Sequence, residues 1–572
     1  MKMIGIASLV FCLALPACGD EESPIEVALD PECWLLRDDL PAPDSIGQAL
    51  RVRSGRPELP PALAFGLPDA DRRPRGGPVP PGVTRTAVAL TLDPAARTLS
   101  GSAQIDLLAE GAELSSVRFL LSAPVDDVQA SDPAAAFSQD GGVLTVTAQS
   151  PVPLGESWTL TVLWHANDVE RMIDFYPGEE GGELLLAYLG KPSTYFAADY
   201  WYWPRAMDVE VLSNLEFAVT YPDDLTLVMS GEHAGTIDNQ DGTATDTWTA
   251  SFPMPWYAAL ALADYQKASG SCGTSQLEVY GMPVQSGNPI VPETYVGVLE
   301  SICNAYRARF GDPAFPVIRM AGVDDRFATG YSSPALLLVT NYTLDDKGTG
   351  SFPARDFYLS HEFSHQWWGN DVFVASMEDV WLIEGMADYS AIEYMRGAWG
   401  EEEALRLWLE DAWYLLDYLQ KGGADHPLVP DPPVEMEPII YYSKGAWVLR
   451  MLEWVLGDDD IDLALRSYRE AHSFSYAVTQ DFIDAAEAAA GEDLDWFFDQ
   501  WLSGTGVMSL RETHQEAGGN FEVTVYQETP WLSDPESYYQ MPLTVRLERG
   551  KQFIDHLVTV SGSQSTHALE KP

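Results

Sequence analysis

A short stretch of the chain carries side chains whose types and spacing suit metal chemistry. His361 and His365 lie four residues apart, and Glu362 directly follows the first of them. On a helix of 3.6 residues per turn, positions four apart share one face, so both imidazoles can meet one ion while Glu362 lies beside them. A catalytic zinc takes three protein ligands and keeps one position open for water. The pattern therefore predicts a zinc site whose third ligand comes from elsewhere in the chain.

Glu384 is the candidate for that third ligand. It lies on a second predicted helix, within the sequence Trp-Leu-Ile-Glu-Gly. Asp388 follows four residues later on the same helix face, where a carboxylate can accept the distal N–H of a ligand histidine and fix its orientation. The alternative for Asp388 is an ordinary surface acid. The alternative for His361 and His365 is a pair of histidines with no metal on an amphipathic helix.

Taken together, these segments resemble the aminopeptidase N family of zinc peptidases, which belongs to the gluzincins. Eighteen residues separate His365 from Glu384, which is the spacing of that family. The sequence Tyr-Ser-Lys-Gly that begins at Tyr442 is similar to the family's Tyr-x-Lys-Gly segment. The resemblance implies that His361, His365 and Glu384 bind one Zn²⁺ ion per chain. It also implies that Glu362 is the general base and that Tyr442 stabilises the transition state.

The chemistry of these groups agrees with such roles. Zinc lowers the pKa of a bound water towards about 7, so a neighbouring carboxylate such as Glu362 can take its proton. The substrate carbonyl oxygen gains negative charge as its carbon becomes tetrahedral, and a phenol such as Tyr442 can donate a hydrogen bond to it. Without the resemblance, Tyr442 and the adjacent Tyr441 would be interpreted as ordinary core aromatics.

One segment departs from the family pattern. Aminopeptidases of this family use a Gly-x-Met-Glu-Asn loop, whose glutamate holds the free α-amino group of the substrate. The matching stretch here contains Gly330, Tyr331 and Ser333, our candidate substrate-binding residues, and Ser333 stands where the glutamate is expected. A neutral hydroxyl cannot anchor an ammonium group as a carboxylate does. Aminopeptidase cleavage, endopeptidase cleavage and a catalytically silent binding lipoprotein of the same fold therefore remain as alternatives.

The elements around these residues predict a multidomain α+β protein. Residues 85–267 predict an N-terminal antiparallel β domain, because alternating or β-branched runs lie between Gly, Pro and Asp turns. Residues 268–503 predict a mainly helical catalytic domain, thermolysin-like by the resemblance, and residues 504–572 predict a small C-terminal β-sandwich. Helices are expected at 292–310, 355–368, 401–420, 443–456, 461–471, 480–490 and 494–502, with a further one that carries Glu384 and ends near residue 397.

The N-terminal part of the chain predicts export. Residues 1–18 combine a basic start, an apolar run and the ending Leu-Pro-Ala-Cys, which resembles a bacterial lipoprotein signal with Cys18 as the lipidated residue. Ordinary secretion with cleavage nearby is the alternative. Residues 19–84 are rich in Pro, Gly and charge, and predict a tether. We therefore expect an exported protein, anchored to a membrane only through lipid at Cys18 and facing the periplasm or the exterior.

Composition limits the partners. The 572 residues carry 86 acidic and 33 basic side chains, a net charge of −53 that disfavours nucleic acid and anionic membrane surfaces. A peptide or protein substrate is the expected partner, and the sequence does not indicate an oligomeric state. No run of about twenty apolar residues predicts a transmembrane helix. Cys272 and Cys303 could form a disulfide in an oxidising compartment, which the sequence leaves open.

Overall fold

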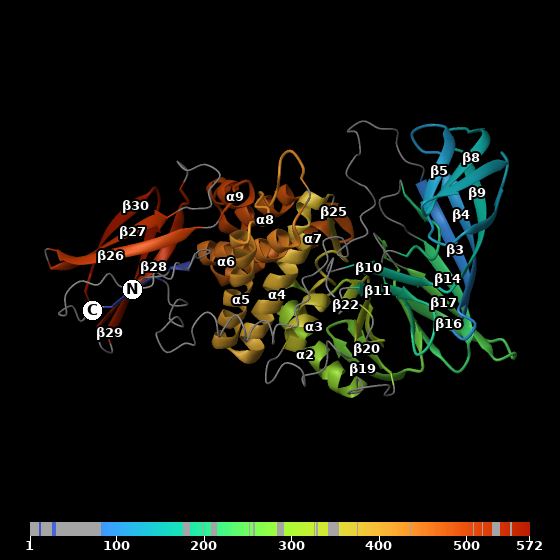
Figure 1. Ribbon diagram of the computed structural model, residues 1–572, viewed down its shortest axis with the longest axis horizontal. Helices are drawn as coiled ribbons and strands as arrows, with labels where there is room; N and C mark the ends of the chain where they lie inside the picture. Colours follow the sequence, from blue (N-terminus) through green and yellow to red (C-terminus); the bar gives the residue numbers. More distant parts are fainter. Residues whose placement is uncertain are drawn as a thin grey trace. The chain divides into compact units, whose positions relative to one another are not determined.

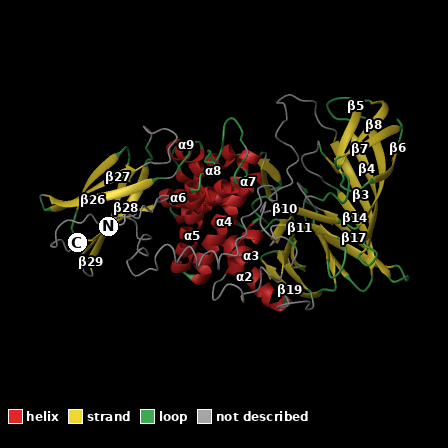
Figure 2. Ribbon diagram, in the orientation of Figure 1, coloured by secondary structure: helices red, strands yellow, loops and turns green. Residues whose placement is uncertain are grey.

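A computed structural model of the chain describes residues 11–12, 26–29, 82–174, 183–197, 200–207, 214–250, 252–254, 258–282, 291–324, 327, 330–340, 354–374, 376–434, 436–506, 508–517, 519–528, 538–549 and 552–571. In chain order these residues form a β-rich region, a helical region and a second β region (Figures 1 and 2), which confirms the predicted α+β class. Two compact units result, one of Gly55–Met377 with Arg469–Ala477, the other of Met1–Ser54, Glu378–Tyr468 and Val478–Pro572.

The predicted signal and tether lie almost entirely outside the described residues, and so does Cys18. Two short strands, β1 (Phe11–Cys12) and β2 (Glu26–Leu29), and the start of β3 are the exceptions. The proposed domain boundaries remain predictions. Among the described residues, we find no helix long and apolar enough to cross a membrane.

The N-terminal β region contains three sheets. Strand β9 illustrates why they form: buried residues alternate with half-buried or exposed ones, so that Trp158, Leu160 and Val162 enter the core. Every described pair of the largest sheet is antiparallel, as predicted, except that β14 runs parallel to β3.

The largest sheet has the order β16 (Glu232–Asp238), β17 (Thr243–Ala250), β14 (Leu215–Pro222), β3 (Gly82–Asp93), β4 (Thr98–Leu108), β9 (Ser157–Asn167) and β6 (Val125–Ala130). The second has the order β13 (Arg205–Ala206), β5 (Leu114–Leu120), β8 (Val143–Val152) and β7 (Ala135–Asp140). The third has the order β10 (Glu170–Asp174), β11 (Glu183–Tyr188), β12 (Thr194–Phe196), β18 (Leu260–Ala263) and β15 (Thr226–Met229).

A five-stranded sheet and two helices complete the first unit. The sheet has the order β19 (Gln266–Cys272), β20 (Ser275–Gly281), β21 (Val317–Val323), β23 (Leu336–Thr340) and β22 (Gly330–Ser333). Most of this sheet was not predicted, because it lies within the region expected to be mainly helical. Helix α2 (Pro292–Phe310) packs against β19, β20 and α3 (Ala354–Ser364). The short strand β24 (Val372–Val374) pairs in parallel with β25 (Ser475–Ala477), which connects the segment Arg469–Ala477 to the first unit.

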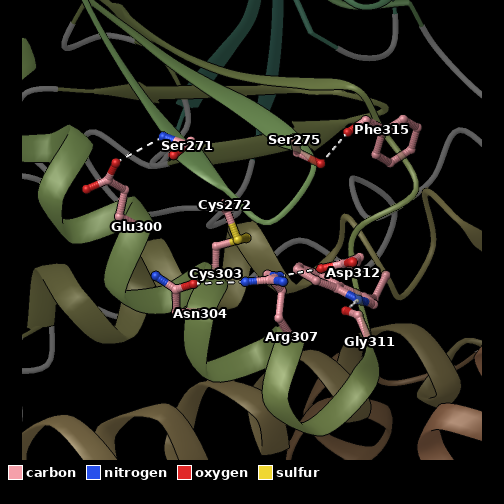
Figure 3. The surroundings of a disulfide bond; sticks show 11 residues. Ser271, Cys272, Ser275, Glu300, Cys303, Asn304, Arg307, Gly311, Asp312 and Phe315 are labelled. Carbon is pink, nitrogen blue, oxygen red and sulfur yellow. Dashed lines mark hydrogen bonds and ion pairs between the residues drawn. A yellow bond between two sulfur atoms is a disulfide. The ribbon is translucent and has the colours of Figure 1, made fainter.

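A disulfide joins Cys272 at the end of β19 to Cys303 on α2, so the pairing that the sequence left open is present (Figure 3). Beside it, Glu300 accepts a hydrogen bond of 2.9 Å from the backbone N–H of Ser271. On α2, the Tyr306 hydroxyl donates 2.9 Å to the backbone carbonyl of Ser360 on α3. The sheet therefore holds α2, and α2 supports the helix that carries the predicted metal ligands.

The second unit contains most of the remaining helical residues, except the last turn of α7, together with the C-terminal strands. Helix α4 packs against α5 and α6, and Figure 1 shows these three side by side. The helices are α4 (Trp381–Trp399), α5 (Glu401–Gln420), α6 (Gly445–Leu456), α7 (Asp458–His472), α8 (Thr479–Ala490) and α9 (Asp495–Leu502), with the π-helix η4 (Ile440–Lys444) directly before α6 and the short η3 (Met377–Asp379) before α4. Two small sheets follow, built from β26 (Ser509–Ala517), β27 (Asn520–Glu528) and β30 (Gln564–Leu569) with β1, and from β28 (Met541–Arg549) and β29 (Gln552–Val560) with β2.

Candidate metal centre

The two predicted histidine ligands lie at the end of α3. His361 is in the last turn of the helix, which ends at Ser364, and His365 begins a tight turn closed by i→i+3 bonds such as Trp367 N–H to the Ser364 carbonyl at 2.8 Å. The predicted helix, 355–368, therefore ended four residues too late. The spacing still brings both imidazoles to one side: their ring centroids are 4.9 Å apart, and both residues are buried.

The orientation of His365 is fixed by a backbone group. Its Nδ1 lies 3.1 Å from the carbonyl oxygen of Trp368, and since a carbonyl only accepts, Nδ1 carries the proton of this hydrogen bond. The lone pair of a neutral imidazole then lies on Nε2. This is the arrangement that metal-ligating histidines use, with one nitrogen on the metal and the other on an acceptor.

His361, His365 and Glu384 form a group whose ligand atoms all lie within 4.8 Å of one another, and all three residues are buried. Two imidazoles and one carboxylate are the ligand set of a catalytic zinc site with an open position. The three predicted ligands are thus brought together, and their chemistry fits Zn²⁺.

Glu362, the predicted base, is buried against the edge strand β22. A Cβ built on Gly330 would lie 3.1 Å from Oε1 of Glu362 and 2.7 Å from the ring of Tyr358, so only glycine allows this close approach. The pKa of Tyr331 is raised by burial and then by the negative charge of Glu362, which places Tyr331 within electrostatic reach of the base. Gly330 and Tyr331 therefore lie beside Glu362, and their role in substrate binding stays a prediction.

Ser333, the third candidate substrate-binding residue, is buried and forms a hydrogen bond with another serine. It is 1% exposed, and its hydroxyl oxygen lies 2.8 Å from that of Ser230, which follows β15. The backbone N–H of Ala259 donates to the Ser333 hydroxyl at 3.4 Å and to the Ser230 hydroxyl at 3.1 Å. No sequence pattern indicates this pair, because Ser230 lies 103 residues before Ser333 in the chain.

Side chains just after the second histidine tie β22 to α3. The amide of Gln366 donates to the Ser332 hydroxyl at 2.8 Å and to the Ser333 carbonyl at 3.1 Å, while its oxygen accepts from Ala335 N–H at 2.9 Å. Asn370 donates to the same Ser332 hydroxyl at 3.2 Å. Gln366 and Asn370 stand in the motif that predicted the metal site, but the motif alone assigned them no role.

In the second unit, Glu384 and Asp388 are both buried on α4. Tyr442 lies in η4, where burial raises the pKa of its phenol well above the ordinary value; the charge of Glu384, a hydrogen bond to it and the charge of Asp388 act in the same direction. The phenol therefore keeps its proton and can donate it in a hydrogen bond. A contact between Asp388 and a ligand histidine stays a prediction, and His365 already uses the Trp368 carbonyl.

Comparisons with known proteins identify the class. Residues 335–501 match the model described as the peptidase family M1 domain. Aminopeptidase N of Escherichia coli is 24% identical over 382 residues, which cover 60% of this chain and 42% of the relative. Glutamyl aminopeptidase of Sus scrofa is 33% identical over 330 residues, covering 54% and 33% respectively. The M1 zinc metallopeptidase structure from Deinococcus radiodurans gives a TM-score of 0.56 at 20% identity, covering 74% of this chain and 94% of that one.

The resemblance drawn from the motifs is thereby confirmed: residues 335–501 carry a peptidase family M1 domain, and the chain is similar to aminopeptidase N and to M1 zinc metallopeptidases. The fold likeness includes a two-domain M1 zinc metallopeptidase structure, with a TM-score of 0.57 over 78% of this chain and 98% of that one. The matched segments span less than half the length of each of the curated relatives named above.

Proposed function

We propose that this protein is a zinc-dependent metallopeptidase that hydrolyses peptide bonds with aminopeptidase-like chemistry. The observation that carries the proposal is the buried His361, His365 and Glu384 group, of which Glu384 lies inside the matched M1 domain together with both histidines. When bound there, Zn²⁺ supplies a Lewis acid that polarises the carbonyl and acidifies water.

The residues of the chain supply the other steps. Glu362 takes the proton of the attacking water and returns it to the leaving amine, as a positioned carboxylate does in general base and acid catalysis. Its burial against Gly330 holds the carboxylate in one place. Tyr442, protonated because its pKa is raised, donates a hydrogen bond to the carbonyl oxygen as charge develops. Loss of one such donor costs about 3 kcal/mol of transition-state stabilisation.

The burial of Ser333 favours a second candidate, endopeptidase cleavage. At the position where the family's glutamate would hold the substrate amine, Ser333 offers a neutral hydroxyl that is already bonded to Ser230. We therefore propose, as this second candidate, that cleavage does not require a free α-amino group on the substrate. One peptide with a free N-terminus and the same peptide acetylated decide the matter: similar cleavage of both supports this proposal, and cleavage of the free peptide alone refutes it.

We also propose that the protein is exported and anchored through Cys18. The disulfide between Cys272 and Cys303 supports an oxidising compartment, where such bonds persist. Fractionation of cells that express the wild type or the Cys18→Ser variant tests the anchor. The wild type is expected with the membranes and the variant in the soluble exported fraction; equal distribution of both contradicts the anchor.

A further inference from the structure

A buried lysine lies two residues from the proposed catalytic tyrosine. Lys444 ends the π-helix that carries Tyr442, and it is 4% exposed. Burial lowers the pKa of its ammonium group to about 8, and the charge of Asp425 partly opposes that shift. Burying an ammonium group is costly, so its retention here calls for a contact that compensates the lost hydration.

That contact is the loop between α9 and the C-terminal strands, which we call the junction loop (residues 504–506). Lys444 Nζ donates to the Gly504 carbonyl at 2.8 Å. The Tyr539 hydroxyl donates to the Thr505 carbonyl at 3.0 Å, and the backbone of Gly506 donates to Asp425. Three successive residues of this loop are therefore each held by a different side chain.

Both glycines of the junction loop stand at positions that do not readily accept a side chain. A Cβ on Gly504 would lie 2.3 Å from the Gln500 carbonyl oxygen, and Gly506 has a φ of +89°. Beyond the loop, the ring of Tyr539 stacks on Trp501 at a centroid distance of 4.2 Å. The junction loop thus lies between Lys444, which binds Gly504, and Tyr539, which binds Thr505.

The π-helix is held from its other side as well, because the Ser443 hydroxyl donates 2.8 Å to Asp411 on α5. Residues two apart on a helix point to nearly opposite sides, so a contact at Lys444 fixes the backbone from which Tyr442 projects. We propose that Lys444 is a positioning residue that couples the junction loop, and through it the C-terminal β region, to the catalytic tyrosine. This inference rests on the proposed peptidase function.

The experiment compares kcat, KM and bound zinc in full-length Lys444→Met, Lys444→Arg and Tyr539→Phe. Lys444→Met is expected to lower kcat at least tenfold, with KM within about twofold and one zinc retained, because neither ligands nor base are touched. Tyr539→Phe keeps the ring stack and loses one loop bond, so we expect a kcat loss of about threefold. Lys444→Arg, which keeps a cationic donor, should recover part of the kcat lost in Lys444→Met.

Lys421→Met is the matched control, since Lys421 is exposed, directly follows α5 and pairs with Asp417 of that helix. It should behave as wild type. A folded Lys444→Met with wild-type kcat overturns the proposal; if that variant does not fold, wild-type kcat in Tyr539→Phe overturns it. A wild-type protein that binds zinc but hydrolyses no peptide refutes the proposed function instead, so the two failures are distinguishable.

Discussion

The crossing of α4 and α6 offers a sharp test of how the site is built. Gly385, directly after the ligand Glu384, packs against Gly445, which follows the π-helix of Tyr442. A Cβ on Gly385 would lie 2.9 Å from both Cα and the carbonyl carbon of Gly445. These are backbone atoms of another helix and cannot turn aside, so Gly385→Ala must push the two helices apart.

Two opposing effects set the change in the free energy of unfolding that Gly385→Ala causes. Overpacking costs typically 1–3 kcal/mol. Alanine gains about 1 kcal/mol of helix propensity over glycine. We expect Gly385→Ala to lose about 0–2 kcal/mol of unfolding free energy net, which corresponds to a fall in Tm of at most a few degrees. Spreading α4 from η4 also separates Glu384 from Tyr442, so zinc affinity should fall about tenfold, as it does when supporting contacts of a ligand are lost.

Gly397→Ala on the same helix is the matched control. Gly397 is exposed, and nothing lies within 4 Å of a Cβ built on it. Only the gain in helix propensity remains, so the free energy of unfolding of this variant should rise by about 1 kcal/mol. Thermal unfolding of the metal-free proteins and a zinc titration measure both effects. If Gly385→Ala is as stable as Gly397→Ala and binds zinc as tightly as the wild type, the close helix contact does not shape the site.

Further predictions concern the base, the buried lysine and the disulfide. Glu362→Gln should keep zinc and lower kcat by several orders of magnitude, whereas His365→Ala should lose both bound zinc and turnover. Near-normal turnover in Glu362→Gln would refute the role of Glu362 as the general base. The folded pKa of Lys444 is lowered to about 8, so above that pH the unfolded state binds more protons than the folded one. The stability of wild type relative to Lys444→Met should therefore rise by about 3 kcal/mol from pH 8 to 10.5 in urea unfolding, and a flat difference contradicts the shift. Reduction of the Cys272–Cys303 bond, which spans 31 residues, should cost about 3–4 kcal/mol; an unchanged unfolding midpoint refutes its stabilising role.

Several elements could be predicted from local signals. Helix 292–310 was predicted with the observed ends because Pro292 suits the first turn and Gly311 suits the end of a helix. The metal ligands could be predicted because a four-residue spacing has one geometric meaning on a helix. Helix α3 was predicted too long, since its end depends on tertiary contacts such as the Trp367 indole donating to the Gly311 carbonyl at 3.1 Å.

Other features depend on contacts that sequence patterns do not encode. Strand β21 is buried along nearly its whole length, and a short apolar run of this kind cannot be told from a buried helix segment by periodicity. The hydrogen bonds from Ser333 to Ser230 and from Lys444 to the junction loop each join residues that are far apart in the chain. The motifs therefore indicate the class of reaction, whereas the contacts of Ser333 and Lys444 are seen only in the folded structure.

The most direct test of the central claim is peptide hydrolysis by the purified full-length protein before and after metal removal. The account predicts that a chelator abolishes hydrolysis and that Zn²⁺ restores it. It also predicts that the wild type and Glu362→Gln bind about one zinc per chain, and that His361→Ala loses this zinc. Hydrolysis that persists fully in the metal-free protein would contradict it, as would a zinc-loaded protein that cleaves nothing in a broad peptide library.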